Sequence, residues 1–472
     1  MKKMTLLTAV FALAFSLYAQ IGVDSTQTYL VTKKDGKPFF WMGDTGWELF
    51  HRLTREEAVY YLNTRQKQGF NVIMAVALAE SNGIRQPNLY GDVPFKNLET
   101  LEWDVTPGNS PDNTIEYDYW DHVDFVVREA AKRNLYIGLL PAWGDKVAYQ
   151  WGEGPMIFNN KPDEAYAFVR KLAERYKSQW NIIWILGGDR AATYERNGRR
   201  HDDRPVWRAM AKAIEDTCGK DVFITYHPGW PETSAYLQHE DWLDMHAHQS
   251  GHGSRVPQPW DIIANDLKKT PKRPSMDLEP CYEDHPVNPW DNKWTRAERG
   301  YFDDYDVRAR IYRGVFAGGA GATYGHHQVW QFLDTTRNAP IWTGDIQIGW
   351  RRALTANAAG HIHHLKDLML SRPDFNRTTD STLVVSDRGN DYRDIIIATR
   401  NQKATYAMVY LPQPKPVQID LNKLSSGRKK VSWFNPTTGK YHEIKGRYTD
   451  GVQLFTPPDR EQKDWVLVID VK

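Results

Sequence analysis

The sequence predicts an α/β fold, a (β/α)8 TIM barrel followed by a small antiparallel β-sandwich domain. Three observations lead to this fold class. Short apolar runs alternate with helical patterns from Phe39 to Trp330, which is typical of parallel strands joined by crossover helices. About eight such strands occur over roughly 290 residues, close to the size of a TIM barrel. After Ser371 the helical patterns stop, and short strand-like runs alternate with Asn, Asp, Gly and Pro turns.

The composition is that of an ordinary globular protein with an excess of aromatic residues. Of 472 residues, 41% are hydrophobic and 25% charged, and 60 basic against 59 acidic side chains give a formal net charge of +1. Such a balance produces no field that gathers a polyanion, which argues against nucleic acid as a partner. The 19 Trp and 24 Tyr residues are typical of pockets for flat or sugar-like ligands. We therefore expect a neutral partner.

The N-terminus has the layout of a secretory signal peptide. Lys2 and Lys3 precede an apolar run over 6–17, and Ala19 offers a small residue for cleavage. The run is too short to span a bilayer, and no later segment is apolar for long enough. We predict a signal peptide over 1–19, export to the periplasm or beyond, and no membrane insertion.

The first barrel unit carries clear start and stop signals. An apolar run over 39–42 ends in Gly and Asp and predicts the first strand. Thr54 begins a helix, with Glu57 as its capping-box partner three residues later. Gly69 ends this helix, and 70–77 form the next apolar strand.

The later units repeat this pattern. No Gly-rich phosphate loop joins a strand to a helix, since the glycines of 318–321 precede a strand, and this disfavours a dinucleotide-binding fold. Predicted helices cover 119–133, 163–176, 204–218 and 305–316, with a linking helix over 353–370. Predicted strands cover 135–140, 182–186, 222–225, 243–247, 275–278 and 322–324.

The C-terminal part reads as a separate small domain. Its strand-like runs are short and separated by turn residues, as in a sandwich of about 100 residues. We predict a barrel domain over 20–371, including the linking helix, and a sandwich over 372–472. The predicted sandwich strands are 383–385, 394–399, 405–411, 417–421, 431–434 and 465–471.

Two carboxylates directly end apolar strands. Asp189 follows the fourth predicted strand and Glu279 the seventh, so both are expected at the barrel mouth, across from one another. Hydrolysis of a glycosidic bond needs such a pair, one carboxyl that protonates the leaving oxygen and one carboxylate that attacks or activates water. A strand-end acid can instead cap a helix or pair with a base, and Arg190 adjoins Asp189. Because both acids occur at opposed strand ends, we interpret them as catalytic.

Other side chains at the predicted strand ends are aromatic, charged or imidazole. They include no serine nucleophile elbow and no phosphate loop. We expect them to form a wall that binds the substrate. The expected binding residues are Asp44, Trp47, Trp143, Arg190, Tyr226, His246, His248, Tyr282 and His326.

Clustered histidines leave two other function classes open. His246 and His248, with His252, and the pair His326 and His327 could bind zinc and activate water. Two histidines that alternate along a strand point to the same side, so His246 and His248 could both face the barrel interior. The same geometry serves sugar hydroxyls, and we favour a site without metal or other cofactor. A non-catalytic carbohydrate-binding protein is the remaining alternative.

Three stretches carry a family resemblance. They are 40–47 (FWMGDTGW), 184–189 (WILGGD) and 279–283 (EPCYE), and they resemble bacterial glycoside hydrolases with a (β/α)8 domain and a small β-sandwich. The chain is most similar to glycoside hydrolase family 140, which implies activity on apiose linkages of the pectin rhamnogalacturonan II. The resemblance covers essentially the whole mature chain. In related proteins the sandwich carries a collagen-binding label, which we do not take literally.

The resemblance also implies roles for the two acids. In the broader set of retaining barrel glycosidases, the proton donor follows the fourth strand and the nucleophile ends the seventh, often five residues after a proline. Pro274 and Glu279 have that spacing, and Asp189 occupies the donor position. The chain departs from that set in having Gly188-Asp189 in place of Asn-Glu. Glu283, in the same loop as Glu279, is the alternative nucleophile. We expect burial and the charge of Glu279 to raise the pKa of Asp189.

Overall fold

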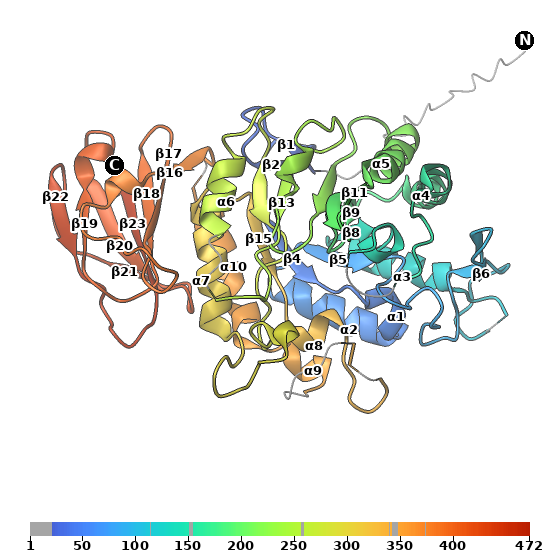
Figure 1. Ribbon diagram of the computed structural model, residues 1–472. Coiled ribbons are helices and arrows are strands. Elements are labelled where there is room, and N and C mark those ends of the chain that lie inside the picture. The colour runs from blue at the N-terminus through green and yellow to red at the C-terminus, as the bar shows by residue number, and fades with distance from the viewer. Residues whose placement is uncertain are drawn as a thin grey trace, which may run out of the picture.

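The structure of the protein is a computed structural model (Figure 1). It describes residues 21–113, 115–150, 154–255, 259–338, 340–341, 348–372 and 374–472. The predicted signal peptide over 1–19 lies outside the described residues. Within these ranges, no helix combines the length and the apolar character needed to cross a membrane.

The centre of the molecule is a curled sheet of parallel strands. Six strands are hydrogen-bonded in the order β12-β9-β8-β5-β4-β15. Two further strands, β13 (His246–His248) and β14 (Ser275–Asp277), pair in parallel with each other. A parallel bridge joins Thr225 to Met245, and the Ala320 amide donates to the Ser275 carbonyl at 2.9 Å. The six strands are β4 (Trp41–Thr45), β5 (Val72–Val76), β8 (Tyr136–Leu140), β9 (Ile182–Gly187), β12 (Ile224–His227) and β15 (Gly321–Tyr324).

Helices follow most of these strands and cover the outside of the sheet (Figure 1). The predicted capping box is confirmed, because Thr54 accepts from the Glu57 amide and Glu57 accepts from the Thr54 amide. The helix predicted over 204–218 has these bounds in the structure. The main helices are α2 (Arg55–Lys67), α3 (Tyr119–Ala131), α4 (Pro162–Tyr176), α5 (Arg204–Cys218), α6 (Pro259–Asp266), α7 (Asp304–Phe316) and α10 (Asn357–Leu370).

Short strands and helical turns lie in the segments that connect the main strands and helices. Three of them are small antiparallel sheets, and the others are single helical turns. The small strands are β1 (Ile21–Val23), β2 (Leu30–Thr32), β3 (Pro38–Phe39), β6 (Phe95–Asn97), β7 (Glu102–Trp103), β10 (Thr193–Arg196) and β11 (Arg199–Asp202). The turns are α1 (Leu49–Arg52), α8 (His327–Trp330), α9 (Trp350–Ala353), η1 (Gly144–Lys146), η2 (Ser234–Leu237) and η3 (Pro289–Asp291).

The period of two along each strand separates an inner core from an outer one. On β5, Val72, Met74 and Val76 join the cluster inside the curled sheet, and Ile73 and Ala75 pack toward the helices. Strands buried on both faces in this way read as continuous apolar runs, which is why the sequence pattern revealed them.

On β13 the same alternation contradicts one expectation. Met245 and Ala247 belong to the inner cluster, so His246 and His248 face away from the interior. The expectation that both histidines face the barrel interior was therefore wrong.

The C-terminal part is an antiparallel sheet in the order β16-β17-β18-β23-β20-β21, with a separate pair β19-β22. On β18, Tyr406, Met408 and Tyr410 join the core that includes α7 and α10, while the alternate residues join the core beneath β19 and β22. The run 383–385 is not a strand, because η4 (Ser381–Leu383) occupies its start. The other elements are β16 (Arg377–Thr379), β17 (Ile397–Asn401), β18 (Tyr406–Leu411), β19 (Val417–Asp420), η5 (Leu421–Lys423), β20 (Lys429–Phe434), β21 (Tyr441–Glu443), β22 (Val452–Phe455) and β23 (Trp465–Val471).

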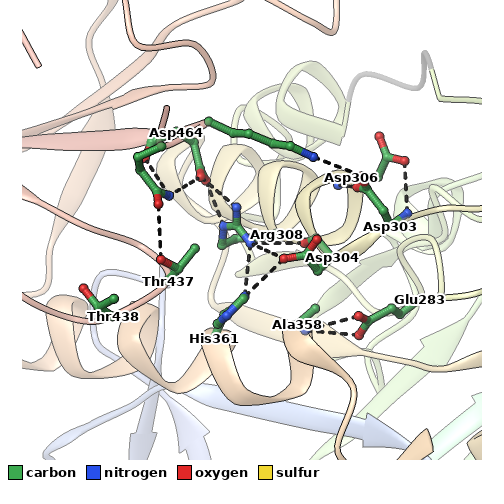
Figure 2. A network of polar contacts seen from close by, with 12 residues as sticks. Glu283, Asp303, Asp304, Asp306, Arg308, Ala358, His361, Thr437, Thr438 and Asp464 are labelled. Atoms are coloured by element: carbon green, nitrogen blue, oxygen red, sulfur yellow. Dashed lines mark hydrogen bonds and ion pairs between the residues drawn. The ribbon is translucent and has the colours of Figure 1, made fainter. Parts of the chain in front are cut away.

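A buried ion pair fastens this sheet to the helical layer (Figure 2). Arg308 on α7 donates from Nη2 to Asp464 Oδ1 at 2.8 Å and from Nε to Oδ2 at 3.0 Å. The Tyr410 hydroxyl donates to the same Oδ2 at 3.0 Å. Arg308 is 1% exposed and Asp464 is fully buried, so breaking the pair would leave a charge in the core.

Candidate active site

A pocket of about 590 Å³ lies at the carboxyl ends of the parallel strands. Its volume falls within the roughly 300–1,000 Å³ typical of ligand pockets. Its aromatic lining consists of Trp47, Trp143, Trp230, Tyr282, Trp290 and Trp330. Its ionisable lining consists of Glu80, Asp189, His252, Glu279, His285 and Asp291.

Glu279 lies just after β14 with its carboxylate between two imidazoles. Its Oε2 is 2.8 Å from His227 Nε2, and its Oε1 is 3.1 Å from His252 Nε2. The backbone amides of Asp189 and Tyr282 donate to the Nδ1 atoms of His227 and His252, at 3.3 and 3.2 Å. Each ring therefore carries its proton on Nε2, facing the carboxylate. Burial opposes ionisation of Glu279, but the contacts with His227 and His252 outweigh it and lower its pKa.

Asp189 lies just after β9 at a sharp bend in the backbone. Gly187 and Gly188 have φ angles of +87° and +107°, and Asp189 itself has +57°, a left-handed conformation that is uncommon outside glycine. Its Oδ1 accepts one hydrogen bond from Gln249 Nε2 at 2.7 Å. Burial and the negative charge of Glu279 raise the pKa of Asp189.

The two carboxyls lie close together but in different environments. One oxygen of Asp189, one oxygen of Glu279 and one ring nitrogen of His227 all lie within 4.8 Å of one another. This spacing lets one carboxyl carry a proton while the other stays ionised, and it also matches a three-ligand metal set. The pair can therefore supply an acid and a nucleophile, or two ligands to an ion.

Three of the predicted binding residues line this pocket. Trp47 and Trp143 have ring centroids 5.1 Å apart, and Trp47 Nε1 donates to the Tyr282 hydroxyl at 2.9 Å. Burial and the charge of Glu279 raise the pKa of Tyr282 well above its usual value, so its hydroxyl stays protonated. These rings make a rigid wall beside Asp189 and Glu279.

Asp44 and Tyr226 do not line the pocket. Asp44 lies within β4 and is fully buried, with Oδ2 2.7 Å from Arg65 Nε on α2. The Tyr226 hydroxyl donates to the Arg190 carbonyl at 2.8 Å, and its ring packs 5.5 Å from Trp207 of α5. Both side chains point from the sheet toward the helical layer, where they join structural contacts.

The remaining predicted binding residues also lie outside the pocket lining. His248 Nδ1 contacts the Glu232 carbonyl at 2.8 Å, and burial lowers the pKa of His246 to about 4. His326 caps α8 by accepting from the Gln328 amide at 3.2 Å. Arg190 donates to the backbone carbonyl of its neighbour Asp189 at 3.0 Å.

Glu283, the alternative nucleophile, points away from the pocket. It accepts from the Ala358 amide near the start of α10, at 3.3 and 3.2 Å (Figure 2). Its Oε2 also accepts from the Tyr324 hydroxyl at 2.7 Å. Glu283 thus accepts a hydrogen bond from a free backbone amide at the start of α10, which is a structural role.

Several pocket residues went unrecognised in the sequence. His227 and Tyr226 both stand at the end of a predicted strand, but only Tyr226 was expected to bind substrate. In the structure His227 contacts Glu279, although it does not line the pocket, and Tyr226 faces the helices. Glu80 lies in the pocket lining shortly after β5, so its strand-end position was a usable signal. Burial and the carboxylate of Glu48 raise the pKa of Glu80 well above its usual range. Gln249 directly follows β13 and also had a strand-end position. The others had no such signal: Trp230, His285 and Asn288 lie in loops, Trp290 and Asp291 in η3, and Trp330 in α8.

Comparisons with known proteins agree with this architecture. A solved structure described as a glycoside hydrolase is 31% identical, with a TM-score of 0.82 over 96% of this chain and 97% of that chain. A glycoside hydrolase family 5 structure from Bacteroides vulgatus is 32% identical, with a TM-score of 0.82 over 96% and 93%. No curated protein matches the chain.

Two families match by sequence. The family described as a collagen-binding domain of a collagenase matches residues 379–470. The family described as "Apiosidase-like, catalytic domain" matches residues 24–376, which include the pocket and both strand-end carboxylates. The chain therefore belongs to the family of apiosidase-like catalytic domains, and the protein is a glycoside hydrolase.

Proposed function

We propose that the protein hydrolyses apiose linkages in side chains of rhamnogalacturonan II, as a member of glycoside hydrolase family 140. One observation carries the mechanism: two carboxyls in an aromatic pocket, whose pKa values are shifted in opposite directions. Such a difference assigns an acid and a nucleophile to two groups that are otherwise alike. The substrate rests on the sequence resemblance and on the apiosidase-like family.

In the proposed first step, Glu279 attacks the anomeric carbon of the bound sugar. Asp189 gives its proton to the glycosidic oxygen, so the bond to the leaving group breaks as the bond to Glu279 forms. His227 and His252 hold the attacking carboxylate by contacts at 2.8 and 3.1 Å. Fixed donors of this kind keep the nucleophile oriented.

In the second step, Asp189 accepts a proton from water, which attacks the anomeric carbon and releases Glu279. Two displacements give net retention of configuration. Carboxyls about 5–5.5 Å apart are typical of retaining enzymes, and about 6.5–9.5 Å of inverting ones. One oxygen of Asp189 lies within 4.8 Å of one oxygen of Glu279, a close approach that is compatible with retention.

We also propose that the eight parallel strands close into a barrel. The bridge between Thr225 and Met245, and the hydrogen bond from Ala320 to Ser275, support closure through β13 and β14. The pattern of 1–19 supports export to the periplasm or cell exterior.

The test is release of sugars from rhamnogalacturonan II and its trimmed fragments, beside other plant and host glycans. Wild type, Asp189→Asn and Glu279→Gln are compared, each with and without a chelator. We expect wild type to cleave an apiose linkage and both variants to lose most of their rate. Cleavage of a different linkage would show that the proposed substrate is wrong. Active Asp189→Asn or Glu279→Gln variants would overturn the assignment of these carboxyls as catalytic.

A metal-dependent hydrolase is the second candidate, because Asp189, His227 and Glu279 have ligand spacing. It replaces the first candidate if the chelator abolishes turnover and Zn²⁺ restores it. We expect turnover to survive chelation, since the contacts of Glu279 with His227 and His252 already fix its two oxygens. Sugar binding without turnover, by wild type and both variants, would instead indicate a carbohydrate-binding protein.

A further inference from the structure

The pocket has a deep end and a rim that differ in exposure. Around Asp189 and Glu279, the rings of Trp47, Trp143 and Tyr282 are at most 4% exposed. At the rim, Trp230 and Trp290 are 41% and 42% exposed, although both line the same pocket. Large apolar rings held half in water at the edge of a site mark a binding surface.

The Trp230 ring is fixed in place by its surroundings. Its Nε1 donates to the Ser250 carbonyl at 3.1 Å. A Cβ atom at Gly251 would lie 2.3 Å from Trp230 Cδ1, and one at Gly253 would lie 2.1 Å from Cζ2. Only glycine at these two positions leaves room for the indole, so the ring is oriented in advance of any ligand.

Arg299 anchors the segment after β14 that carries Trp290. Both guanidinium arms of Arg299 bind Asp291, each at 2.7 Å, and the same side chain donates to the Asn288 carbonyl at 2.8 Å. The Trp290 ring lies 5.8 Å from His285, which stacks at 4.1 Å on His252, the ring that contacts Glu279. A continuous row of rings therefore joins this part of the rim to the nucleophile.

We propose that Trp230 and Trp290 form a second platform, which stacks on the sugar next to the cleaved linkage. The two ring centroids are 6.3 Å apart and the planes differ by 37°, so they make one concave apolar surface. Asn288 and Asp291 beside them supply acceptors for sugar hydroxyls. The deep end holds the sugar that is cleaved, and the rim gives the enzyme its preference for an oligosaccharide over a single sugar. This inference rests on the proposed function.

The platform is tested by binding in the Glu279→Gln background, which prevents turnover. Calorimetry compares methyl apioside with an apiose-containing oligosaccharide of rhamnogalacturonan II. Addition of Trp230→Ala or Trp290→Ala should lower the ratio of oligosaccharide to methyl apioside affinity about tenfold, as loss of an aromatic contact does. Trp230→Phe should restore part of the ratio. Tyr441→Ala, which removes a 48% exposed ring from β21, is the matched control and should leave it unchanged.

The outcomes separate this inference from the proposed function. If the ratio of oligosaccharide to methyl apioside affinity is unchanged in both Trp variants, and wild type still hydrolyses the oligosaccharide, the platform is overturned. The proposed function is then unaffected. Equal loss of both affinities overturns it too, because it indicates damage to the whole pocket. If wild type neither binds nor hydrolyses the apiose-containing probes, the proposed function fails first and the platform fails with it.

Discussion

The pocket and the interface beneath the C-terminal sheet both hold buried carboxylates, but they partner them differently. At the interface, Asp464 receives two hydrogen bonds from Arg308, one from Tyr410 and one from Gln462. In the pocket, Glu279 is held by two imidazoles while it lines a cavity of about 590 Å³. Asp189 accepts a side-chain hydrogen bond from Gln249.

This difference separates architecture from chemistry. A carboxylate that is paired with a guanidinium and closed off from the cavity cannot reach a ligand. A carboxylate that is held by imidazole N–H groups on one side and faces a cavity on the other remains able to react with a ligand.

The largest effect should come from Glu279→Gln. The amide has the shape of the carboxylate but cannot attack a sugar, so kcat/KM should fall on the order of 10⁴-fold. Hydrolysis of the best glycan is the measurement, with thermal unfolding to show that the variant is folded. A variant that retains a tenth of the rate would show that Glu279 is only a binding residue.

Asp189→Asn should cost about 10²–10⁴-fold on natural linkages, because the leaving oxygen then departs without a proton. The loss should be much smaller on an aryl glycoside whose leaving group needs no proton. Comparison of the two substrates is the check. Equal losses on both would remove Asp189 from the role of proton donor.

At the interface, Arg308→Met should lower the free energy of unfolding by about 3–5 kcal/mol, since it leaves Asp464 buried without its cation. Turnover measured well below the unfolding transition should stay within about twofold of wild type, because neither Arg308 nor Asp464 lines the substrate pocket. Denaturant unfolding provides the measurement, and Arg308→Met with Asp464→Leu should recover much of the stability. Lost turnover in a stable single variant would tie the interface to catalysis.

His227→Ala should shift the acidic limb of the pH–rate profile to higher pH. The imidazole contact holds the pKa of Glu279 low, and activity needs Glu279 ionised, so losing the contact raises the pH at which activity appears. The basic limb reports Asp189, whose raised pKa keeps it protonated until higher pH. His246→Ala, a buried histidine outside the pocket lining, is the control and should leave the acidic limb in place.

The smallest effect on stability and turnover taken together should come from Glu283→Gln. Glu283 caps α10 and accepts from Tyr324, so the amide should cost roughly 0.5–2 kcal/mol of stability and less than about threefold in kcat/KM. Parallel measurements of unfolding and turnover, beside Glu279→Gln, make the comparison direct. A loss of rate as large as that of Glu279→Gln would exchange the roles of the two acids.

The parts of the fold that local patterns determine could be predicted from the sequence. Apolar runs and capping residues located the strands and helices, including the bounds of 204–218. Because the carboxyl ends of parallel strands meet at one edge, the order of strands along the chain was enough to place the strand-end acids Asp189 and Glu279 together. The sharp bend at Asp189 follows a pair of glycines, which the sequence also displays.

Long-range contacts decided the rest. Whether Tyr226 or His227 contacts Glu279 depends on the register of β12, because a shift of one residue exchanges the two faces of the strand. Asp44 has the strand-end position of a site residue, but it forms an ion pair with Arg65 of α2, in the helical layer. The rim residues Trp230 and Trp290 lie on loops after β12 and β14, whose paths no local pattern predicts.

In the proposed mechanism, Glu279 becomes covalently attached to the sugar while Asp189 moves the proton. Mass spectrometry after incubation with a 2-deoxy-2-fluoro glycosyl fluoride of the cleaved sugar tests it most directly, because fluorine slows release of the intermediate. We expect one adduct per chain, on the peptide that carries Glu279, with loss of activity in step with labelling. An adduct on Glu283, or full turnover of the natural substrate with inverted configuration and no adduct, would contradict it.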